Sequence, residues 1–347
     1  MTTTQYTWTV IGAGPAGIAA TGKLLDLGVA PERIAWIDPC FAAGDLGGKW
    51  RAVPGNTPVS MFLEYLEGAA SFRYRDAPRF ELADVDPRDT CPLGMVADPL
   101  VWITDHLAGR VRTVRGMADE LTLRDRRWTV TTDRGTITSE KVILAVGSTA
   151  KSLACPGRRE IPLDIALNPE KLAAQPLDGA VVAVFGSSHS SMIALPNLLD
   201  RPVAKVINFY RSPLRYALPM DGWTLFDDTG LKGQAARWAR ENIDGVLPRR
   251  LERVHTGSAE FSSRLDECDH VVHTVGFERR RKPSTPQWGA LEHNPTNGVL
   301  APGLFGLGVA YPNCAADPLG GTQFRVGLQK FMSHLSAVLP IWDRYGI

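Results

Sequence analysis

The feature that most restricts the fold of this chain lies almost at its N-terminus. A short apolar run, residues 8–11, is followed by Gly12, Gly14 and Gly17 at the spacing G-x-G-x-x-G, and then by an Ala- and Leu-rich helical pattern. We interpret this stretch as a strand, a tight turn and a helix. Gly12 permits the turn, Gly14 lets the backbone approach a pyrophosphate, and Gly17 allows close packing of the helix. The helix N-terminus offers unpaired N–H groups and the positive end of a dipole, so the turn is predicted to hold a phosphate.

A carboxylate follows this turn at the spacing that a ribose-binding site needs. Residues 34–37 indicate a second strand, and Asp38 comes directly after it. Because Asp38 lies about 20 residues beyond the last glycine, it is expected to accept hydrogen bonds from ribose hydroxyls. An ordinary strand–turn–helix unit without a ligand is the alternative.

The bulk properties are those of a soluble globular protein. The chain has 347 residues, 44% of them hydrophobic and 22% charged, with a formal net charge of +1. This length suggests two domains or one large one, and the charge gives no reason to expect a nucleic acid or an anionic membrane as partner. No apolar run approaches a membrane span, and the first strand begins too early to leave room for a secretory signal, so we expect a cytoplasmic protein.

The five cysteines, at positions 40, 91, 155, 268 and 314, are odd in number and scattered, which disfavours a disulfide framework. No C-x-x-C or C-x-x-x-x-C pair exists, so the chain lacks the local dithiol with which disulfide reductases pass electrons. No metal site is expected either, because His270 and His273 would point to opposite faces of a predicted strand.

The first half continues as an irregular excursion over residues 40–59, with helices predicted over 61–70 and 98–108. A β-meander over 111–138 follows, with a hairpin turn at 133–135. It leads to a buried parallel strand, residues 141–148, which includes Ala145 and Gly147 near its end. The glycine suggests that the backbone passes close to another group, although a plain core strand is the alternative.

After a proline-rich passage, the strand–turn–helix design returns at residues 180–199. Its turn is Gly186, Ser187, Ser188, His189 and Ser190, with serines in place of the later glycines. Two phosphate turns in one chain imply two dinucleotides.

Cations, rather than a carboxylate, follow the next strand of this second unit. Residues 206–210 indicate that strand, and Arg211 and Arg215 come after it. A 2′-phosphate prefers arginine, so the second ligand is predicted to be NADP. The alternative is that these arginines are solvated surface residues.

Residues 221–247 form an insertion that could be a lid, a substrate wall, a cap on the core or a dimer contact. Residues 270–277 indicate a strand with Gly276 near its end, and residues 303–309 a short one broken by glycines, including Gly308. A C-terminal helix is predicted from near Thr322 to about residue 339. Its N-terminus would point at a cofactor ring if the preceding strand returns to the first sheet.

Taken together, these motifs and their order resemble the flavoproteins with two dinucleotide-binding domains, a superfamily that includes thioredoxin-reductase-like enzymes and class B flavin monooxygenases. The resemblance spans essentially the whole chain. It implies an α/β fold of two Rossmann-like domains with a small β-meander in each, and FAD and NADPH as cofactors. The FAD-binding domain would comprise residues 1–155 and 290–347, and the NADP-binding domain, inserted into it, residues 156–289.

One motif favours the monooxygenase branch. Gly47, Gly48, Lys49 and Trp50 are similar to the Gly-Gly-x-Trp of flavin monooxygenases, and Asn56 follows where a polar side chain could face the flavin. The bridging F-x-G-x-x-x-H-x-x-x-Y/F signature of those enzymes is absent, and the chain is short for them.

The resemblance implies an FAD-dependent, NADPH-consuming oxidoreductase. We expect a monooxygenase that acts through a C4a-hydroperoxyflavin on a soft nitrogen or sulfur centre of a small molecule, with oxygen as co-substrate and Trp50 and Asn56 as catalytic contributors. The alternatives are an NADPH-dependent reductase of a quinone or external disulfide, and a non-catalytic redox sensor. A homodimer is a possible assembly. The residues expected to contact the cofactors are Gly12, Gly14, Pro15, Ala16, Gly17, Asp38, Pro39, Gly48, Lys49, Trp50, Ala145, Gly147, Gly186, Ser187, Ser188, His189, Ser190, Arg211, Arg215, Gly276, Gly308, Thr322 and Gln323.

Overall fold

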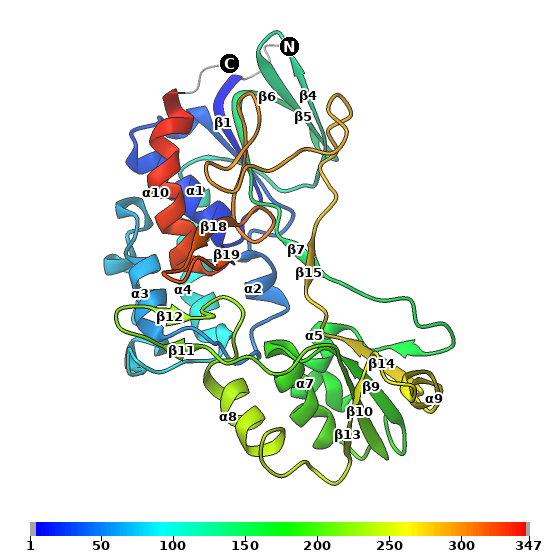
Figure 1. Ribbon diagram of the computed structural model, residues 1–347. Coiled ribbons are helices and arrows are strands. Elements are labelled where there is room, and N and C mark those ends of the chain that lie inside the picture. The colour runs from blue at the N-terminus through cyan, green and yellow to red at the C-terminus, as the bar shows by residue number, and fades with distance from the viewer. Residues whose placement is uncertain (1–4, 345–347) are drawn as a thin grey trace.

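The computed structural model describes residues 5–344, and these form two bodies, each built on its own sheet (Figure 1). The first sheet has eight strands, and β17, β6, β1, β2 and β3 run parallel as neighbours in that order. The antiparallel meander β4–β5–β6 and the antiparallel edge strand β16 complete it. Its strands are β1 (Gln5–Ile11), β2 (Ile34–Ile37), β3 (Arg112–Val114), β4 (Ala118–Arg124), β5 (Arg127–Thr132), β6 (Gly135–Leu144), β16 (Val299–Ala301) and β17 (Leu304–Gly306).

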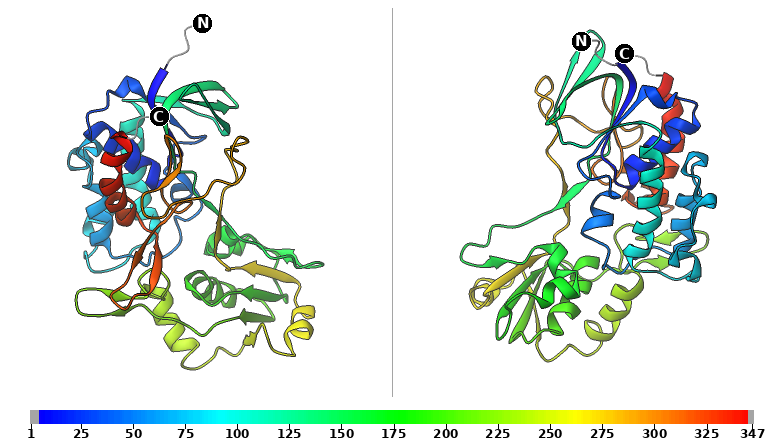
Figure 2. Two further views of the ribbon diagram at one scale, coloured as in Figure 1. Left: turned by 45° about the horizontal axis from the view of Figure 1, so that its top comes forward. Right: turned by 180° about the vertical axis from the view of Figure 1, so that it is seen from behind.

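Side chains of the first sheet alternate between two buried layers. Trp8, Val10 and Trp36 point to a layer of helices, whereas Ile11 and Ile37 point to the layer beneath the meander. Seen from behind, the helices lie on one side of the sheet and the meander on the other (Figure 2). The helices of this body are α1 (Pro15–Asp26), α2 (Gly44–Gly48), α3 (Val59–Leu66), α4 (Leu93–Ala108) and α10 (Leu328–Arg344), with short 3-10 helices at Pro31–Arg33, Ala70–Phe72, Tyr74–Asp76 and Glu81–Asp84.

The second body is a five-stranded, wholly parallel sheet in the order β13–β10–β9–β14–β8. Its central strands β9 and β10 are short and mostly apolar, as expected for a parallel sheet covered on both faces. The elements are β8 (Arg159–Glu160), β9 (Val181–Phe185), β10 (Lys205–Tyr210), β13 (Leu251–His255), β14 (His270–His273), α5 (Leu163–Ala166), α6 (Pro169–Ala173), α7 (His189–Leu199), α8 (Gly233–Asn242) and α9 (Phe261–Asp266).

Three two-stranded ribbons complete the described chain. The ribbon of β7 (Ser148–Ala150) and β15 (Phe277–Arg279) carries the chain from the first body to the second and back (Figure 1). The ribbon of β11 (Leu218–Pro219) and β12 (Thr224–Leu225) lies in the insertion, and that of β18 (Asn313–Ala316) and β19 (Thr322–Arg325) precedes α10. The second sheet is thus inserted in sequence between β6 and β16 of the first.

The C-terminal helix α10 returns to the first sheet and is anchored there by aromatic packing. The rings of Trp342 and Phe305 stack with centroids 4.6 Å apart, and Trp342 Nε1 donates to the carbonyl of Asn297 at 2.6 Å. Because Trp342 is fully buried, the end of the chain contributes to the core of its first unit. None of the helices in residues 5–344 has the length and apolar composition that a membrane crossing requires.

The structure confirms the predicted α/β class with two parallel-sheet units, and it changes several details. The meander of the first unit is present, but the second sheet contains no antiparallel strand among the described residues. The predicted strands at 136–138 and 141–148 are parts of one long strand, β6, followed by β7. The excursion at 40–59 holds one short helix, α2.

The prediction of a helix from near Thr322 is wrong at its start. Thr322 and Gln323 lie in β19, and α10 begins at Leu328. The Asp317 carboxylate accepts hydrogen bonds from the backbone of Leu319 and Gly321, which closes a tight turn. This turn folds the segment back on β18 as a hairpin, so helix formation is delayed by six residues relative to the prediction.

Candidate functional site

The first glycine turn is a place where side chains cannot be accommodated. Gly12 has φ +107°, and a Cβ on it would lie 2.2 Å from the carbonyl oxygen of Ala145. A Cβ on Gly17 would lie 1.8 Å from the carbonyl oxygen of Gly12. Both glycines are therefore required for α1 to start so close to the ends of β1 and β6.

The N-terminus of α1 is left open for an anion. Gly14 is its N-cap and Pro15 its first residue, no side chain caps it, and its first turn contains no acidic residue. Gly308, with φ +84°, lies against the same helix start, where a Cβ on it would be 2.5 Å from the Cβ of Ala16. The late glycine and the first motif thus meet at one point, as the sequence predicts.

Asp38 is positioned against this turn by backbone amides. Its Oδ2 accepts a hydrogen bond from the N–H of Ala13 at 2.7 Å, and its Oδ1 accepts from the N–H groups of Cys40 and Phe41, both at 2.8 Å. A carboxylate has about four lone-pair sites, so further bonds from hydroxyl groups remain available. Pro39 lies between these contacts, at the start of the loop to Phe41.

The second turn repeats the first in geometry. Gly186 has φ +121°, and a Cβ on it would lie 2.3 Å from Oγ1 of Thr274 at the end of β14. Ser188 is the N-cap of α7, and neither a capping side chain nor an acidic residue occupies the first turn, which starts with His189 and Ser190. Ser187 Oγ donates to the carbonyl of Ser212 at 3.0 Å.

Two side chains that the sequence analysis did not single out fix both turns in the same way. Trp36 Nε1 donates to the carbonyl of Gly12 at 2.9 Å, and Asn208 Nδ2 donates to the carbonyl of Gly186 at 2.7 Å. Both lie on the strand next to the turn, opposite Val10 and Val184 respectively. Trp36 and Asn208 occupy the same position in the second strand of each unit, and comparing the two units at that position would have identified both.

A cationic edge flanks the second turn. Tyr210 stands in the second unit where Asp38 stands in the first, two residues after the matched pair Asn208 and Trp36, and the exposed Arg211 comes next. The guanidinium of Arg215 stacks on Phe226, 4.6 Å from the ring centroid.

A third arginine at this edge, Arg253 of β13, was not predicted. It stacks on Tyr210 at 4.2 Å. Its Nη2 is buried without a hydrogen-bond partner within the described chain, and burial lowers its pKa. This unsatisfied donor could serve an anionic ligand.

Glycines also bracket the ribbon between the bodies. Gly147 has φ +72° just before β7, and Gly276 has φ +93° just before β15. Arg280, directly after β15, forms an ion pair with Asp45 of α2, so the return crossing is tied to the first body.

The Gly-Gly-Lys-Trp segment lies at the end of α2, beside this crossing. Trp50 packs edge-on against Phe277 of β15, with ring centroids 6.0 Å apart, and Lys49 Nζ lies 3.5 Å from Asp45 Oδ2. Apart from its chain neighbours and its own helix backbone, a Cβ built on Gly48 would meet no heavy atom of residues 5–344 within 4 Å. Trp50 is thus brought to the junction of the two bodies.

Asn56, in contrast, lines a cavity of about 280 Å³. Segments far apart in sequence form its walls, among them the loop around Asn56, the start of α7, the insertion, and the start of α10. The lining residues that enter the argument below are Asn56, Phe62, His189, Asp227, Lys232 and Lys330. The structure therefore brings together Asn56, the second turn and the N-terminus of α10, but not Trp50.

A buried ionic cluster forms the polar end of this cavity. Lys330, 6% exposed, donates to Asp227 and, at 2.8 Å, to Asp228, while Lys232 Nζ lies 2.8 Å from Asp227 Oδ1. Burial alone would raise the pKa of Asp227, but hydrogen bonds from Lys232 and Lys330 outweigh it and hold the pKa below its usual value. The insertion is thereby fixed to α10.

Two further polar groups lie near this end of the cavity, and of these His189 lines it. Burial lowers the pKa of His189, with the charge of Lys232 acting in the same direction, and its Nδ1 has no hydrogen-bond partner among residues 5–344. The Gln323 side chain accepts a hydrogen bond from the N–H of Asp228 at 3.2 Å, and its contact with a cofactor stays a prediction. Thr322 is exposed on the hairpin.

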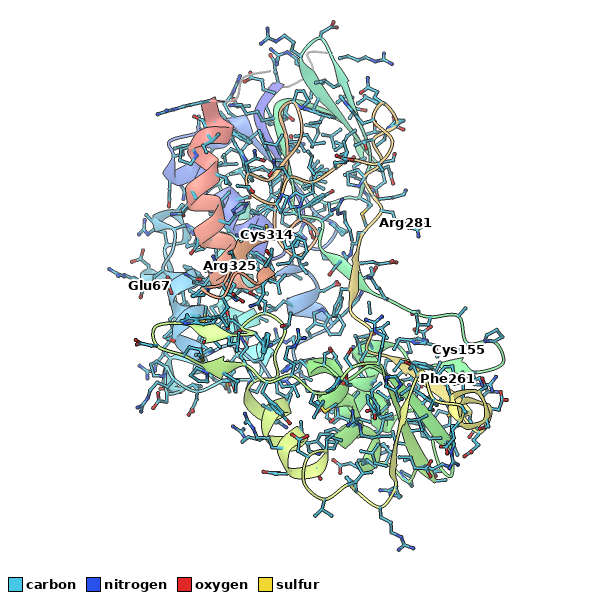
Figure 3. All side chains as sticks on the ribbon, viewed as in Figure 1. Glu67, Cys155, Phe261, Arg281, Cys314 and Arg325 are labelled. Atoms are coloured by element: carbon cyan, nitrogen blue, oxygen red, sulfur yellow. The ribbon has the colours of Figure 1, made fainter. Side chains whose placement is uncertain are left out.

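The cysteines do not form a reactive pair. All five are free, and Cys155 and Cys314 lie in different bodies, near α9 and beside α10 respectively (Figure 3). Burial raises the pKa of Cys91, and it raises the pKa of Cys268 to about 11, which disfavours both thiolates.

The known proteins that resemble this chain are monooxygenases and disulfide reductases. No family model matches the chain. A curated protein, Monooxygenase AgnR1 of Paecilomyces divaricatus, is 33% identical over 380 aligned residues, which cover 96% of this chain and 97% of that protein.

Solved structures share the fold at low sequence identity. The L-lysine 6-monooxygenase of Pseudomonas syringae superposes with a TM-score of 0.67 and 15% identity over 98% of this chain and 99% of that one. A flavin-containing monooxygenase of Stenotrophomonas maltophilia gives 0.62 and 16% over 97% and 98%. The bacillithiol disulfide reductase of Staphylococcus aureus gives 0.64 and 11% over 97% and 98%. The chain therefore belongs to the family of this curated monooxygenase, and it has the fold of the FAD/NAD(P)-binding flavoproteins with two dinucleotide-binding domains, which include thioredoxin-reductase-like enzymes and flavin monooxygenases.

Proposed function

We propose that this protein is an FAD-dependent, NADPH-consuming monooxygenase that oxidises a soft nitrogen or sulfur centre of a small molecule. The observation that carries the proposal is the pair of matching glycine turns, each closed by a hydrogen bond to the carbonyl of its first glycine. The similarity to a curated monooxygenase over nearly the whole of both chains supports the reaction type.

The first turn fits FAD. A Cβ would fill the cradle at Gly12 and Gly17, and the uncapped start of α1 can take the pyrophosphate between its N–H groups. Asp38 would accept from the ribose hydroxyls. We assign the FAD-binding domain to residues 1–155 and 290–347, and the NADP-binding domain to residues 156–289.

The second turn fits NADPH. Gly186, Ser187, Ser188 and the start of α7 would take its pyrophosphate, and the arginines after β10 its 2′-phosphate. The unsatisfied Nη2 of Arg253 adds a third cation to Arg211 and Arg215, which favours NADPH over NADH.

When bound, FAD would accept a hydride from NADPH and supply the electrons that activate oxygen. The protein's own task is placement. The Asn56 amide would donate a hydrogen bond to the reacting oxygen, and Phe62 and its apolar neighbours on the cavity wall would exclude water. Trp50, packed on Phe277 at the ribbon, is expected to act on the geometry of the two bodies, and its contact with the flavin stays a prediction.

The test is anaerobic reduction of the purified protein by NADPH or NADH, followed by rapid mixing with oxygen while the flavin spectrum is recorded. A monooxygenase should be reduced faster by NADPH and show a transient species before the oxidised spectrum returns. Direct reoxidation without a transient, coupled to reduction of an added quinone or disulfide, would instead identify a reductase.

The nicotinamide preference is tested separately with Arg211→Ala. The substitution should weaken NADPH binding by roughly tenfold or more, because a charge-assisted bond to the 2′-phosphate is lost, and leave NADH binding almost unchanged. Equal losses for both nucleotides would contradict the assignment of the 2′-phosphate site.

A further inference from the structure

Lys232 lies where two cavities meet. It lines the inner cavity of about 280 Å³ described above and an outer cavity of about 510 Å³, and Asn56 lines both as well. The outer cavity is formed by the start of α8 and by the segment before α4. The two cavities therefore adjoin at Lys232 and Asn56.

Cations outnumber carboxylates among the residues that line the outer cavity. The outer cavity presents Arg88, Arg237 and Lys232 against Asp89. Arg88 is paired with Asp86, but Arg237 has no acidic partner within 4 Å in the part of the chain that the structure describes. A cavity with such an excess of positive charge attracts anions and repels cations.

In the inner cavity the carboxylates are already engaged. Asp227 is shared between Lys330 and Lys232, and Asp228 accepts from Lys330 and from the N–H of Val326. The Lys232 ammonium has three donors, of which Asp227 takes one. Lys232 therefore has two donors to spare at the polar end, whereas Lys330, which donates to Asp227 and Asp228, has one.

The remaining wall of the inner cavity is apolar. Leu46, Val53, Met61, Phe62, Leu93 and Leu328 line it. Such a wall recognises a hydrocarbon or aromatic body, while a few polar groups fix its orientation.

We infer that the substrate is an apolar molecule that carries one anionic oxygen group, such as a carboxylate, and that Lys232 binds this group. This inference rests on the proposed function, because it names the substrate class of that site. Lys232 is thus a specificity-determining residue, and Arg237 steers the anion toward it.

The alternative anionic ligand for Lys232 is a phosphate of NADPH, because His189 of the second turn lines the same cavity. The experiment has to separate the two. Binding of benzoate and of its neutral analogue benzamide is measured on the FAD-loaded protein by titration calorimetry and by thermal shift, and binding of NADP⁺ is measured in parallel. The variants are Lys232→Met and Arg237→Gln, with Arg249→Gln as control, because Arg249 is an exposed cation beside a different hollow.

We expect benzoate to bind the wild-type protein at least tenfold more tightly than benzamide, and Lys232→Met to remove this preference. Arg237→Gln should lower benzoate affinity a few-fold and reduce its dependence on salt, whereas Arg249→Gln should change neither. NADP⁺ affinity should stay within about twofold in Lys232→Met, since NADP⁺ is held elsewhere.

Equal binding of benzoate and benzamide to the FAD-loaded protein, or no binding of either, overturns the inference and leaves the proposed function standing. A parallel loss of NADP⁺ and benzoate affinity in Lys232→Met also overturns it, because the lysine then serves the cofactor. If Lys232→Met does not fold, unchanged benzoate affinity in Arg237→Gln has the same consequence. A protein that takes up no FAD defeats the proposed function itself, so the two failures are distinct.

Discussion

A single methyl group added at Gly17 should separate FAD binding from the rest of the fold. In Gly17→Ala, the new Cβ would lie 1.8 Å from the carbonyl oxygen of Gly12, whereas real Cβ atoms essentially never come closer than 3.0 Å to such an atom. The start of α1 and the turn must therefore move apart by at least 1.2 Å, which is 3.0 minus 1.8. The second unit already carries a side chain at the matching position, the buried Ser191.

The magnitude follows from the hydrogen bonds that such a shift breaks. A displacement of this size takes an N–H group at the start of α1 out of bonding range of a phosphate oxygen. A hydrogen bond to a charged group contributes about 1.5–3 kcal/mol, so the loss of one should raise the Kd for FAD by roughly 10- to 150-fold. Overpacking should also cost about 1–3 kcal/mol of stability.

The assay is a titration of apoprotein with FAD, followed by flavin fluorescence, together with thermal unfolding. Gly109→Ala is the matched control, because a Cβ there would make only ordinary contacts, the nearest at 3.6 Å. Wild-type FAD affinity in Gly17→Ala, with the protein folded, would refute the assignment of this turn to the cofactor.

Three further perturbations test other parts of the structure. Lys330→Met leaves Asp227 and Asp228 without their shared buried cation and should lower the free energy of unfolding in denaturant by about 3–5 kcal/mol. Adding Asp227→Asn and Asp228→Asn should restore part of this stability. An unchanged stability in Lys330→Met would contradict the buried cluster. Asn208→Ala removes hydrogen bonds to the carbonyls of Gly186 and Val184, so it should lower the free energy of unfolding by about 1–3 kcal/mol and weaken NADP⁺ binding more than FAD binding. Equal effects on the two affinities would contradict this assignment. Burial, aided by Arg279 and His334, lowers the pKa of His293 to about 4, so between pH 6.5 and about 4 the unfolded chain binds more protons than the folded one, and stability should fall as the pH falls through this window and stay level above it. His293→Gln should make the melting temperature depend less steeply on pH in this window. Part of the dependence should remain, because burial also lowers the pKa of His189, His273 and His334. An unchanged slope would show that His293 does not titrate in this way.

The parts of the fold that depend on local chemistry were predictable from the sequence. Gly17 is crowded by the carbonyl of Gly12, five residues earlier, so its constraint is local, and Gly12 is marked by the same short motif although its own close neighbour is the distant Ala145. The meander was predictable for the same reason, since alternation and the hairpin turn at 133–135 are local signals. The order of these motifs then sufficed to predict two parallel-sheet units.

What the sequence could not supply was the meeting of distant segments. Nothing near Lys330 indicates that it pairs with Asp227, more than 100 residues earlier, and only the folded chain shows that the insertion forms a cavity wall. Trp50 and Asn56 are six residues apart, yet one packs at the ribbon and the other lines the cavity, because the chain turns at residues 50–53, where the N–H of Val53 donates to the carbonyl of Trp50. Gln323 was misplaced because a hairpin turn formed where helical periodicity suggested a helix start.

The central claim is that the N-terminal turn holds FAD and the later one NADPH. It is tested most directly by measuring the flavin content of the purified protein and the anaerobic bleaching of that flavin by NADPH and NADH. The account predicts one FAD per chain, bleached by NADPH faster than by NADH. A colourless protein that takes up no added FAD, or a bound flavin that NADPH leaves oxidised, would contradict it.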